Sequence, residues 1–302
     1  MPTLNSTKVT FSFIVINYNS YDHTHKCIVS IKNNCRNHSF EIILIDNASS
    51  DDSVNKLENK FKDVIFVKND ENYGFARACN QGLDHASAEF LIFLNNDFEF
   101  TTDIFNRIID KFKQNNNLGL LGFQLLNPDG TLQKTGFIFP SIWRRILQLI
   151  IVPMLRKRTS AIHAKPDQAD QVVDYIKGAL MILPSKLLNQ LNLRFDENYF
   201  MYHEEMDLAY QLRQHGKICL LDFTPAGIHY GMHFEEVSNE RIFLWRNKNY
   251  LYFIKKNYGK AKSVIFALIN ILIFSMKWLS PFGNSAHRRT YQKVIRLSLD
   301  YL

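Results

Sequence analysis

Short apolar runs alternate with segments of helical periodicity over the first hundred residues of the chain. Runs of this length with few polar residues are typical of strands buried in a sheet, and they lie at 11–16, 41–45, 64–67 and 90–94. The segments between them have helical spacing and lie at 21–36, 52–61 and 73–86. Strands that alternate with helices predict an α/β fold with a mostly parallel central sheet and right-handed crossovers.

Polar residues follow three of these runs at the point where each run ends. Asn17–Ser20 follows the first run, Asp46–Asp52 the second and Asn95–Asp97 the fourth. Ligands of open α/β sheets bind beyond the carboxyl ends of the strands, so this edge is the predicted site. No G-x-G-x-x-G motif follows the first run, which excludes the usual dinucleotide-binding fingerprint.

The end of the fourth run offers ligands for a cation. Asp97, with Asn95 and Asn96 before it, could hold a divalent ion against phosphate, because Mg²⁺ and similar ions prefer oxygen ligands. Asn-Asn-Asp is also favourable turn chemistry, which is the alternative explanation. Turn chemistry alone does not account for similar polar ends on neighbouring strands.

A second acidic group lies after an aromatic run near residue 200. Glu204, Glu205 and Asp207 are within four residues of one another. Carboxylates that repel one another are tolerated where a cation, a polar substrate or solvent offsets the repulsion. The alternative is a solvated helix start, because acidic residues favour the first turn of a helix.

These motifs occur in an order that resembles a known family. Taken together, they are similar to those of inverting family 2 glycosyltransferases with the GT-A fold, and nearest to the bacterial rhamnosyltransferase-like subgroup. Each motif alone is weak, but the ordered set is specific and covers about residues 9–235. The matching segments are I-N-Y-N at 16–19, I-D-N-A-S-S-D at 45–51, N-Y-G-F-A-R-A-C-N-Q-G at 72–82, L-N-N-D at 94–97, G-A-L-M at 178–181, the segment 195–207 and H-Y-G at 229–231.

The resemblance implies a nucleotide-binding role for five residues. Asp46 matches the carboxylate that hydrogen-bonds the base, and Asn17 lies beside that pocket. Arg77 and Asn80 lie on the helix that closes over the base and ribose. Asn95 takes the first place of the D-x-D metal motif, where it would touch ribose or metal-bound water.

The resemblance also implies the metal ligands and the catalytic base. Asp97 takes the last place of the D-x-D motif and would bind Mg²⁺ or Mn²⁺, while His229 matches a late histidine that ligates the metal or donates to the diphosphate. Glu205 falls where the family usually has an aspartate base, and Glu204 is the second candidate. A lone histidine is otherwise more often a packed or surface residue than a ligand.

The chemistry of glycosyl transfer requires two acidic centres of this kind. A sugar hydroxyl is a weak nucleophile, so a carboxylate must take its proton during attack. The departing nucleoside diphosphate needs a cation and nearby donors. We therefore expect an inverting, metal-dependent hexosyltransferase of cell-surface polysaccharide synthesis. It would move a sugar, with rhamnose among the candidates, from a dTDP- or UDP-sugar to a saccharide or lipid-linked acceptor.

Two alternatives keep a similar fold. A noncatalytic membrane-bound scaffold would account for Asn95 and Glu205 as departures from the family pattern. A sugar-nucleotide pyrophosphorylase would need a glycine-rich, basic triphosphate loop after the first strand. The segment Asn17–Ser20 does not resemble such a loop.

The charge distribution predicts a second region after the catalytic domain. We expect a GT-A domain over residues 1–240 and a basic, amphipathic helical appendage over 241–302, which has 12 basic residues and one acidic residue. A second basic and apolar segment lies at 141–158. Basic residues among long apolar runs fit an anionic membrane surface better than nucleic acid. The apolar run Ser263–Met276 has 14 residues, fewer than the ~20 that span a bilayer.

The remaining features predict the location of the protein. The first eight residues are polar and contain no apolar signal-peptide run. The four cysteines show no C-x-x-C pair and no zinc spacing, so free thiols in a reducing compartment are expected. We therefore expect a cytoplasmic protein, peripheral on the inner face of the cell membrane.

Overall fold

The structure is a computed structural model, and it describes residues 9–151, 161–162, 170–231, 239–279 and 287–302. The chain divides into two compact units, which we call the sheet unit and the helical unit. The sheet unit comprises Met1–Ile138, Ala161–Phe200 and Glu204–Met232. The helical unit comprises Phe139–Ser160, Met201–His203 and His233–Leu302. It therefore contains the whole predicted appendage, together with two earlier segments.

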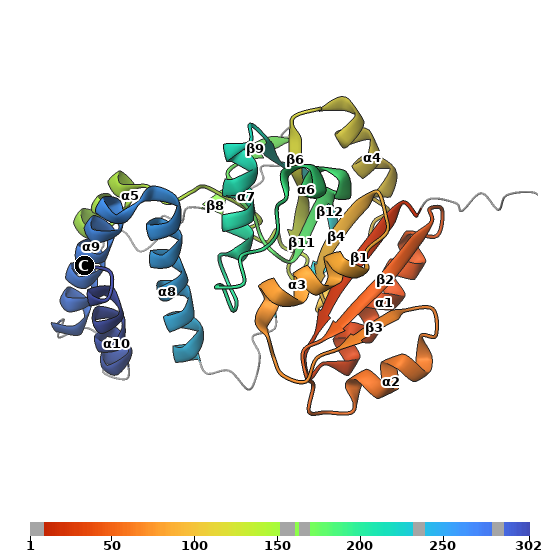
Figure 1. The fold of residues 1–302 in the computed structure, drawn as a ribbon, viewed down its shortest axis with the longest axis horizontal. Coiled ribbons are helices and arrows are strands. Elements are labelled where there is room, and N and C mark those ends of the chain that lie inside the picture. The colour runs from red at the N-terminus through yellow and green to blue at the C-terminus, as the bar shows by residue number, and fades with distance from the viewer. Residues whose placement is uncertain (1–8, 152–160, 163–169, 232–238, 280–286) are drawn as a thin grey trace, which may run out of the picture. The chain divides into compact units, whose positions relative to one another are not determined.

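The first part of the sheet unit alternates strands and helices as the pattern predicts (Figure 1). Strands β1 to β4 are mutually parallel where they pair, in the order β3-β2-β1-β4. The crossovers are helical, as parallel neighbours require. The elements are β1 (Phe11–Asn17), α1 (Tyr21–Asn34), β2 (Phe40–Asp46), α2 (Ser53–Lys60), β3 (Ile65–Lys68), α3 (Gly74–His85) and β4 (Phe90–Asn95).

The second part of the sheet unit extends the same sheet beyond β4. Strand β11 pairs antiparallel with both β4 and β6, β12 is parallel to β6, and the short β5 is antiparallel to β12. The full order is β3-β2-β1-β4-β11-β6-β12-β5, with β9 paired to β12. The strands are β5 (Phe98–Phe100), β6 (Leu118–Leu126), β9 (Gln171–Val173), β11 (Leu180–Pro184) and β12 (Ile218–His229). The predicted fold class is confirmed.

Three helices and a small sheet complete this unit. The helices are α4 (Phe105–Gln114), α6 (Ser185–Leu191) and α7 (Glu204–Gln214). The small sheet has the order β10-β7-β8, with β7 (Gly136–Phe137), β8 (Ala161–Ile162) and β10 (Tyr175–Ile176).

Alternate residues of β1 point to opposite faces of the sheet and contact different helices. Phe11, Phe13 and Val15 are fully buried in one apolar cluster with residues of α1, α2 and α4. Ile14 points to the opposite face, as the two-residue period of a strand requires. There it touches α3 so closely that a Cβ on Gly82 would lie 2.2 Å from its Cγ2 atom. Helices therefore cover both faces of this part of the sheet (Figure 1).

The strand register gathers the predicted polar residues at one edge. Asn17, the last residue of β1, pairs with Asp46, the last residue of β2. On the other side of β1, Ile16 pairs with Asn95 at the end of β4. His229 ends β12 and pairs with Phe98, the first residue of β5. The parallel pairing of β1 with β2 and β4, together with the antiparallel pairing of β5 with β12, thus places side chains from distant parts of the sequence at the carboxyl edge of the sheet.

The helical unit has its own apolar core. Phe253, Phe266, Phe274 and Val294 are buried there. Its helices are α5 (Ile142–Ile151), α8 (Asn239–Tyr258), α9 (Lys260–Leu279) and α10 (Arg288–Leu299). Of the basic segment predicted at 141–158, residues 152–158 lie outside the described residues.

Helix α9 is longer than its apolar run predicts. It has 20 residues because Lys260 to Lys262 and Lys277 to Leu279 continue the helix at both ends. By length and composition it is able to cross a membrane, although 39% of its most apolar window is buried within the protein. Length alone therefore does not determine whether α9 spans a membrane. That depends on what each face of the helix contacts.

Candidate active site

Asn17 is the centre of a polar network at the ends of β1 and β2. Its Nδ2 atom donates to Asp46 Oδ1 (2.7 Å), Ser49 Oγ (3.1 Å) and Ser53 Oγ (3.2 Å). Its Oδ1 atom accepts from Thr24 Oγ1 (2.7 Å), which fixes the orientation of the amide. Asn17 is fully buried, so its role is to hold its hydrogen-bonding partners, Asp46 among them, in position.

The carboxylate of Asp46 is held by this network. Ser49 donates to it twice, from the hydroxyl to Oδ1 (2.6 Å) and from the backbone N–H to Oδ2 (3.0 Å). Together with Asn17, these donors fix both oxygens in one orientation. A fixed acceptor of this kind suits recognition of a planar base, since its geometry is set before the ligand arrives.

Helix α3 carries two more of the residues assigned to nucleotide binding, Arg77 and Asn80, and they differ in environment. Arg77 is half exposed, its guanidinium stacks 3.7 Å from the centre of the Tyr73 ring, and its Nε lies 4.0 Å from Glu197. Asn80 is buried and holds a loop: it donates to Phe195 O (2.9 Å) and Glu197 Oε1 (2.9 Å), and accepts from Phe195 N (3.0 Å). Arg77 is therefore presented at the surface, whereas the polar atoms of Asn80 hold the chain that leads to α7.

Asn95, Asp97 and His229 form a compact group. His229 Nε2 lies 3.3 Å from Asp97 Oδ1 and 3.2 Å from Asn95 Nδ2. Asp97 and His229 are both buried, and the backbone N–H of Tyr230 donates to the carbonyl oxygen of Asp97 (3.0 Å). The structure thus brings together all three residues that the resemblance assigns to the metal motif.

Two residues outside any predicted motif contact His229. Gln133 Oε1 lies 2.8 Å from His229 Nδ1 and accepts a hydrogen bond from Lys177 Nζ (2.6 Å). Lys177 Nζ itself lies 3.3 Å from Nδ1. Sequence reasoning missed both, because Gln133 follows an ordinary turn and Lys177 precedes a motif without belonging to its pattern. Only the pairing of distant segments identifies them.

The two glutamates that begin α7 point to different surroundings, as successive helical residues do. Glu204 is buried, and its Oε2 atom has no hydrogen-bond partner among the described residues. Burial, and then the charge of Glu205, raises the pKa of Glu204 well above its usual range. Glu205 is half buried, and a Cβ on Gly178 would lie 3.7 Å from its Cβ. Burial therefore favours the neutral form of Glu204, while Glu205 lies beside the loop before β11.

Three consecutive residues before β11 connect the parts of the site. Lys177 reaches Gln133 and His229, and Gly178 lies against Glu205. The carbonyl oxygen of Ala179 accepts from the backbone N–H of Asn95 (3.1 Å). One short segment of backbone therefore adjoins both acidic centres at the carboxyl edge of the sheet.

Asp97 and His229 fit a divalent ion that also binds a ligand phosphate. No group of three or more histidine, cysteine, aspartate or glutamate residues with metal-binding geometry occurs in the described part of the chain. Mg²⁺ and similar ions, however, are usually held by one or two carboxylates plus substrate phosphates. A carboxylate oxygen 3.3 Å from an imidazole nitrogen, with both residues buried, supplies two such ligands and leaves the rest of the coordination to the donor.

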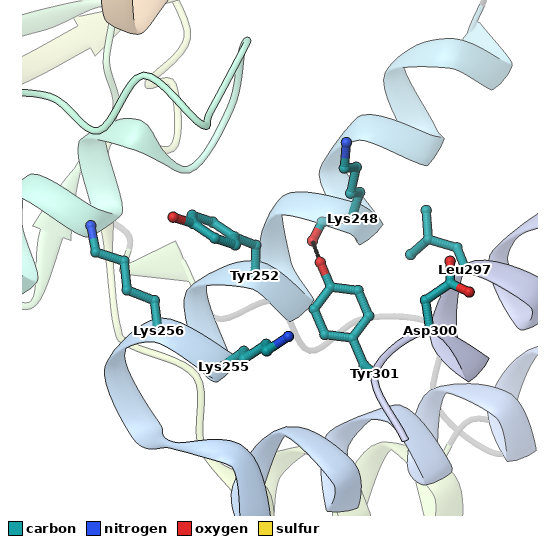
Figure 2. Close-up of a pocket in the computed structure, with 7 residues that line it drawn as sticks. All are labelled: Lys248, Tyr252, Lys255, Lys256, Leu297, Asp300 and Tyr301. Atoms are coloured by element: carbon teal, nitrogen blue, oxygen red, sulfur yellow. Dashed lines mark hydrogen bonds between the residues drawn. The ribbon is translucent and has the colours of Figure 1, made fainter.

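A separate hollow lies within the helical unit and differs in character from this site (Figure 2). It has a volume of about 560 Å³ and lies between α8 and the end of α10. The Lys255 ammonium lies 5.7 Å from the centre of the Tyr301 ring, whose hydroxyl donates to the Lys248 carbonyl oxygen (3.4 Å). Its lining is basic and aromatic: Lys248, Tyr252, Lys255, Lys256, Leu297, Asp300 and Tyr301.

The fold and the polar strand edge define a GT-A glycosyltransferase, and the comparisons identify its family. The family model of glycosyl transferase family 2 matches residues 12–163. The chain belongs to this family. Among curated proteins, it is 19% identical over 234 residues to the N-acetylglucosaminyl-diphospho-decaprenol L-rhamnosyltransferase of Mycobacterium tuberculosis, with 73% of this chain and 76% of the relative covered.

Other comparisons agree with this assignment. Over 127 residues the chain is 32% identical to the GalNAc(5)-diNAcBac-PP-undecaprenol beta-1,3-glucosyltransferase of Campylobacter jejuni, with 41% of this chain and 40% of the relative covered. Among solved structures, S. aureus TarS residues 1–349 align with a TM-score of 0.55 at 15% identity, covering 97% and 81% of the two chains. GalNAc-T7 with UDP, GalNAc and Mn²⁺ aligns with a TM-score of 0.65 at 16% identity, covering 98% and 57%. At these identities, the structural comparisons show the shared fold.

Proposed function

We propose that this glycosyltransferase transfers a sugar from a nucleoside-diphosphate donor with inversion, and that a divalent ion assists the transfer. The observation that carries the proposal is the pair of distinct acidic centres beside residues 177–179. One centre is Asp97 with His229, and the other is Glu205. A single displacement needs one group on the side of the leaving diphosphate and another on the side of the acceptor.

Glu205 is the proposed base. As the acceptor oxygen attacks the anomeric carbon, Glu205 takes the hydroxyl proton and the bond from that carbon to the diphosphate oxygen breaks. Glu204 is less suited to this task, because burial raises its pKa and favours the protonated form, which cannot take up a proton. Glu205 is less buried than Glu204, although its Oε2 atom is enclosed, and this difference favours Glu205 as the residue that meets the acceptor hydroxyl.

The donor binds at the ends of β1, β2 and β4 in this proposal. Asp46, held by Asn17 and Ser49, accepts from the base, and Arg77 supplies a cation at the rim. Asn95 contacts the ribose or a bound water. Asp97 and His229 would hold Mg²⁺ or Mn²⁺, which neutralises charge that develops on the leaving diphosphate.

The relatives support a lipid-linked or saccharide acceptor. The rhamnosyltransferase and the glucosyltransferase both bear names of polyprenyl-diphosphate-linked acceptors. We infer the same acceptor class here, in cell-surface polysaccharide synthesis, with a dTDP- or UDP-sugar as donor and rhamnose as the first sugar to test.

Transfer kinetics of two matched variants test the assignment of the base. Glu205→Gln keeps the size of the side chain but cannot take a proton, so turnover should fall about 10²–10⁴-fold with donor affinity little changed. Glu204→Gln replaces a buried carboxyl group, whose neutral form burial favours, by a neutral amide and should cost far less. Loss of turnover in Glu204→Gln alone would reverse the two roles. Absence of donor hydrolysis and transfer in the wild type, across dTDP- and UDP-sugars, would instead favour the noncatalytic scaffold.

A specific observation also favours a peripheral membrane position. One face of α9 packs within the helical unit, where Arg145 donates to the buried side chain of Asn270. The opposite face carries an exposed apolar stripe with helical spacing, which we call the α9 stripe: Ile265, Leu268, Leu272, Met276 and Leu279. An apolar face of this kind, on a helix whose other face is already packed, suits insertion into one leaflet more than a span.

The charge of the helical unit is complementary to an anionic surface. Residues 241–302 have 12 basic residues and one acidic residue. The lysines that line the hollow shown in Figure 2 contribute to this excess of positive charge. We therefore propose that the helical unit binds anionic lipid on the cytoplasmic face of the membrane, which would bring the enzyme to a lipid-linked acceptor.

A further inference from the structure

Gln133 is held in one orientation between four polar groups. Its Nε2 atom donates to the backbone oxygen of His229 (3.1 Å) and to Asn127 Oδ1 (2.9 Å). Its Oε1 atom accepts from Lys177 Nζ (2.6 Å) and faces His229 Nδ1 at 2.8 Å. The reversed amide would place two donors opposite each other at Lys177 and acceptors opposite each other at Asn127 and His229. Only the observed orientation satisfies all four contacts.

This orientation determines which ring nitrogen of His229 carries the proton. Two groups face Nδ1, the Gln133 amide oxygen at 2.8 Å and the Lys177 ammonium at 3.3 Å. The closer contact is to the oxygen, which can only accept, so Nδ1 is the donor. In the neutral ring, Nε2 is then unprotonated, so it accepts from Asn95 Nδ2 at 3.2 Å. It also faces Asp97 Oδ1 at 3.3 Å, and a cation bound between these two acceptors would offset their repulsion. A histidine that binds a metal ion needs this arrangement, with one nitrogen free to ligate and the other donating to a fixed acceptor.

We propose that Gln133 is a positioning residue, which holds His229 in the Nδ1–H tautomer so that Nε2 is ready to bind the divalent ion beside Asp97. Lys177 stabilises this arrangement, because its ammonium group donates to the amide oxygen and so opposes rotation of the amide into the reversed orientation. The inference rests on the proposed role of Asp97 and His229 as metal ligands. It goes further by naming what prepares the histidine before any ion arrives.

The tautomer can be measured in the metal-free protein, independently of catalysis. In ¹⁵N-correlated spectra of the histidine rings at pH 8, the resonance that is missing from a His229→Asn sample assigns His229. We expect an unprotonated Nε2 and a protonated Nδ1 in the wild type. Gln133→Leu removes the acceptor, so His229 should change to the Nε2–H tautomer that free imidazole side chains favour. Gln133→Glu keeps the acceptor and should keep the wild-type tautomer.

Metal affinity supplies the second readout. Mn²⁺ titration in the presence of UDP should show a loss of about 10–100-fold in Gln133→Leu, which is typical when the partner of a metal-binding histidine is removed. Gln133→Glu should bind Mn²⁺ at least as tightly as the wild type. Gln114→Leu makes the same change at an exposed position on α4 and should leave both readouts unchanged. Thermal unfolding confirms that each variant is folded.

The outcomes separate this inference from the proposed function. A wild-type His229 with Nε2–H, or a tautomer that is unchanged in Gln133→Leu, overturns the inference whether or not Mn²⁺ binds. Equal Mn²⁺ affinity in wild type and Gln133→Leu also overturns it. A wild type that shows the expected tautomer but binds no Mn²⁺ overturns the proposed metal site instead and leaves the tautomer assignment standing.

Discussion

Asp97 Oδ1 and His229 Nε2 lie 3.3 Å apart, although they come from distant parts of the sheet unit's sequence. The antiparallel pairing of β5 with β12 produces this proximity, because it places His229 opposite Phe98, the residue after Asp97. The hydrogen bond from Tyr230 N to the Asp97 carbonyl oxygen (3.0 Å) holds the two backbones together at that point. The short β5 thus joins the metal motif to the end of β12.

Asp97→Asn should abolish saturable binding of Mn²⁺ in the presence of UDP while leaving the fold intact. The change keeps the shape of the side chain but removes the charge, and carboxylate charge dominates the affinity of hard divalent ions. Isothermal titration measures the binding. Asp110→Asn, at an exposed position on α4, is the matched control. Unaltered Mn²⁺ affinity in Asp97→Asn would show that the ion binds elsewhere.

Gly74→Ala should lower the free energy of unfolding by roughly 1–3 kcal/mol. Gly74 has a φ of +82°, and a Cβ there would lie 2.1 Å from the carbonyl oxygen of Phe200. That oxygen also accepts from Phe75 N (2.7 Å), so it is not free to move away. Denaturant unfolding measures the change.

Gly130→Ala separates the two causes of that loss. Gly130 has nearly the same φ, +81°, but a Cβ there would meet no atom within 4 Å. Its replacement introduces the backbone strain alone. We expect a clearly smaller loss than in Gly74→Ala, and equal losses would show that the contact with Phe200 contributes nothing.

His203 should make stability fall as the pH decreases from about 6.5 toward 4. Burial, and then the charge of Arg246, lowers the pKa of His203 to about 4. The unfolded chain therefore takes up this proton at a higher pH than the folded chain does, which favours unfolding across that interval. His203→Asn removes the titrating group and tolerates the positive φ of 76° at this position.

Denaturant unfolding at several pH values between about 6.5 and about 4.5 measures this effect. The free energy of unfolding should fall less steeply in His203→Asn than in the wild type. His215→Asn, at an exposed position after α7, should follow the wild type. Parallel curves for wild type and His203→Asn would mean that His203 titrates normally in the folded protein.

Replacing leucines of the α9 stripe should weaken binding to anionic vesicles. Leu268 and Leu272 are 52% and 51% exposed. Burying a leucine side chain contributes about 1.5 kcal/mol or more, so Leu268→Gln and Leu272→Gln should each reduce binding about tenfold. Flotation with phosphatidylglycerol vesicles measures it, and the wild-type binding should weaken with salt because exposed charges are screened.

Val172→Gln is the control for the stripe, because Val172 is similarly exposed but lies on β9 of the sheet unit. It should float like the wild type. Wild-type protein that remains with the vesicles after both high salt and alkaline carbonate would show that α9 spans the membrane. Wild-type protein that does not float with the vesicles at all would contradict the proposed membrane binding.

The sequence by itself determined the α/β fold and the places where polar residues interrupt it. Apolar runs and helical spacing predicted β1 to β4 with the helices between them, because local periodicity reports which residues are buried in each element. The same periodicity placed Asn17, Asp46 and Asp97 at strand ends. The ordered motifs then indicated the family, which the family model confirms.

Only the tertiary structure decided how these residues act together. Glu204 and Glu205 are equivalent in the sequence, but helix geometry buries one and leaves the other beside Gly178. Gln133 and Lys177 belong to no motif, because their contact with His229 depends on the pairing of strands that are distant in the chain. Sequence patterns report local burial, whereas the protonation and orientation of a side chain depend on neighbours that only the folded chain brings together.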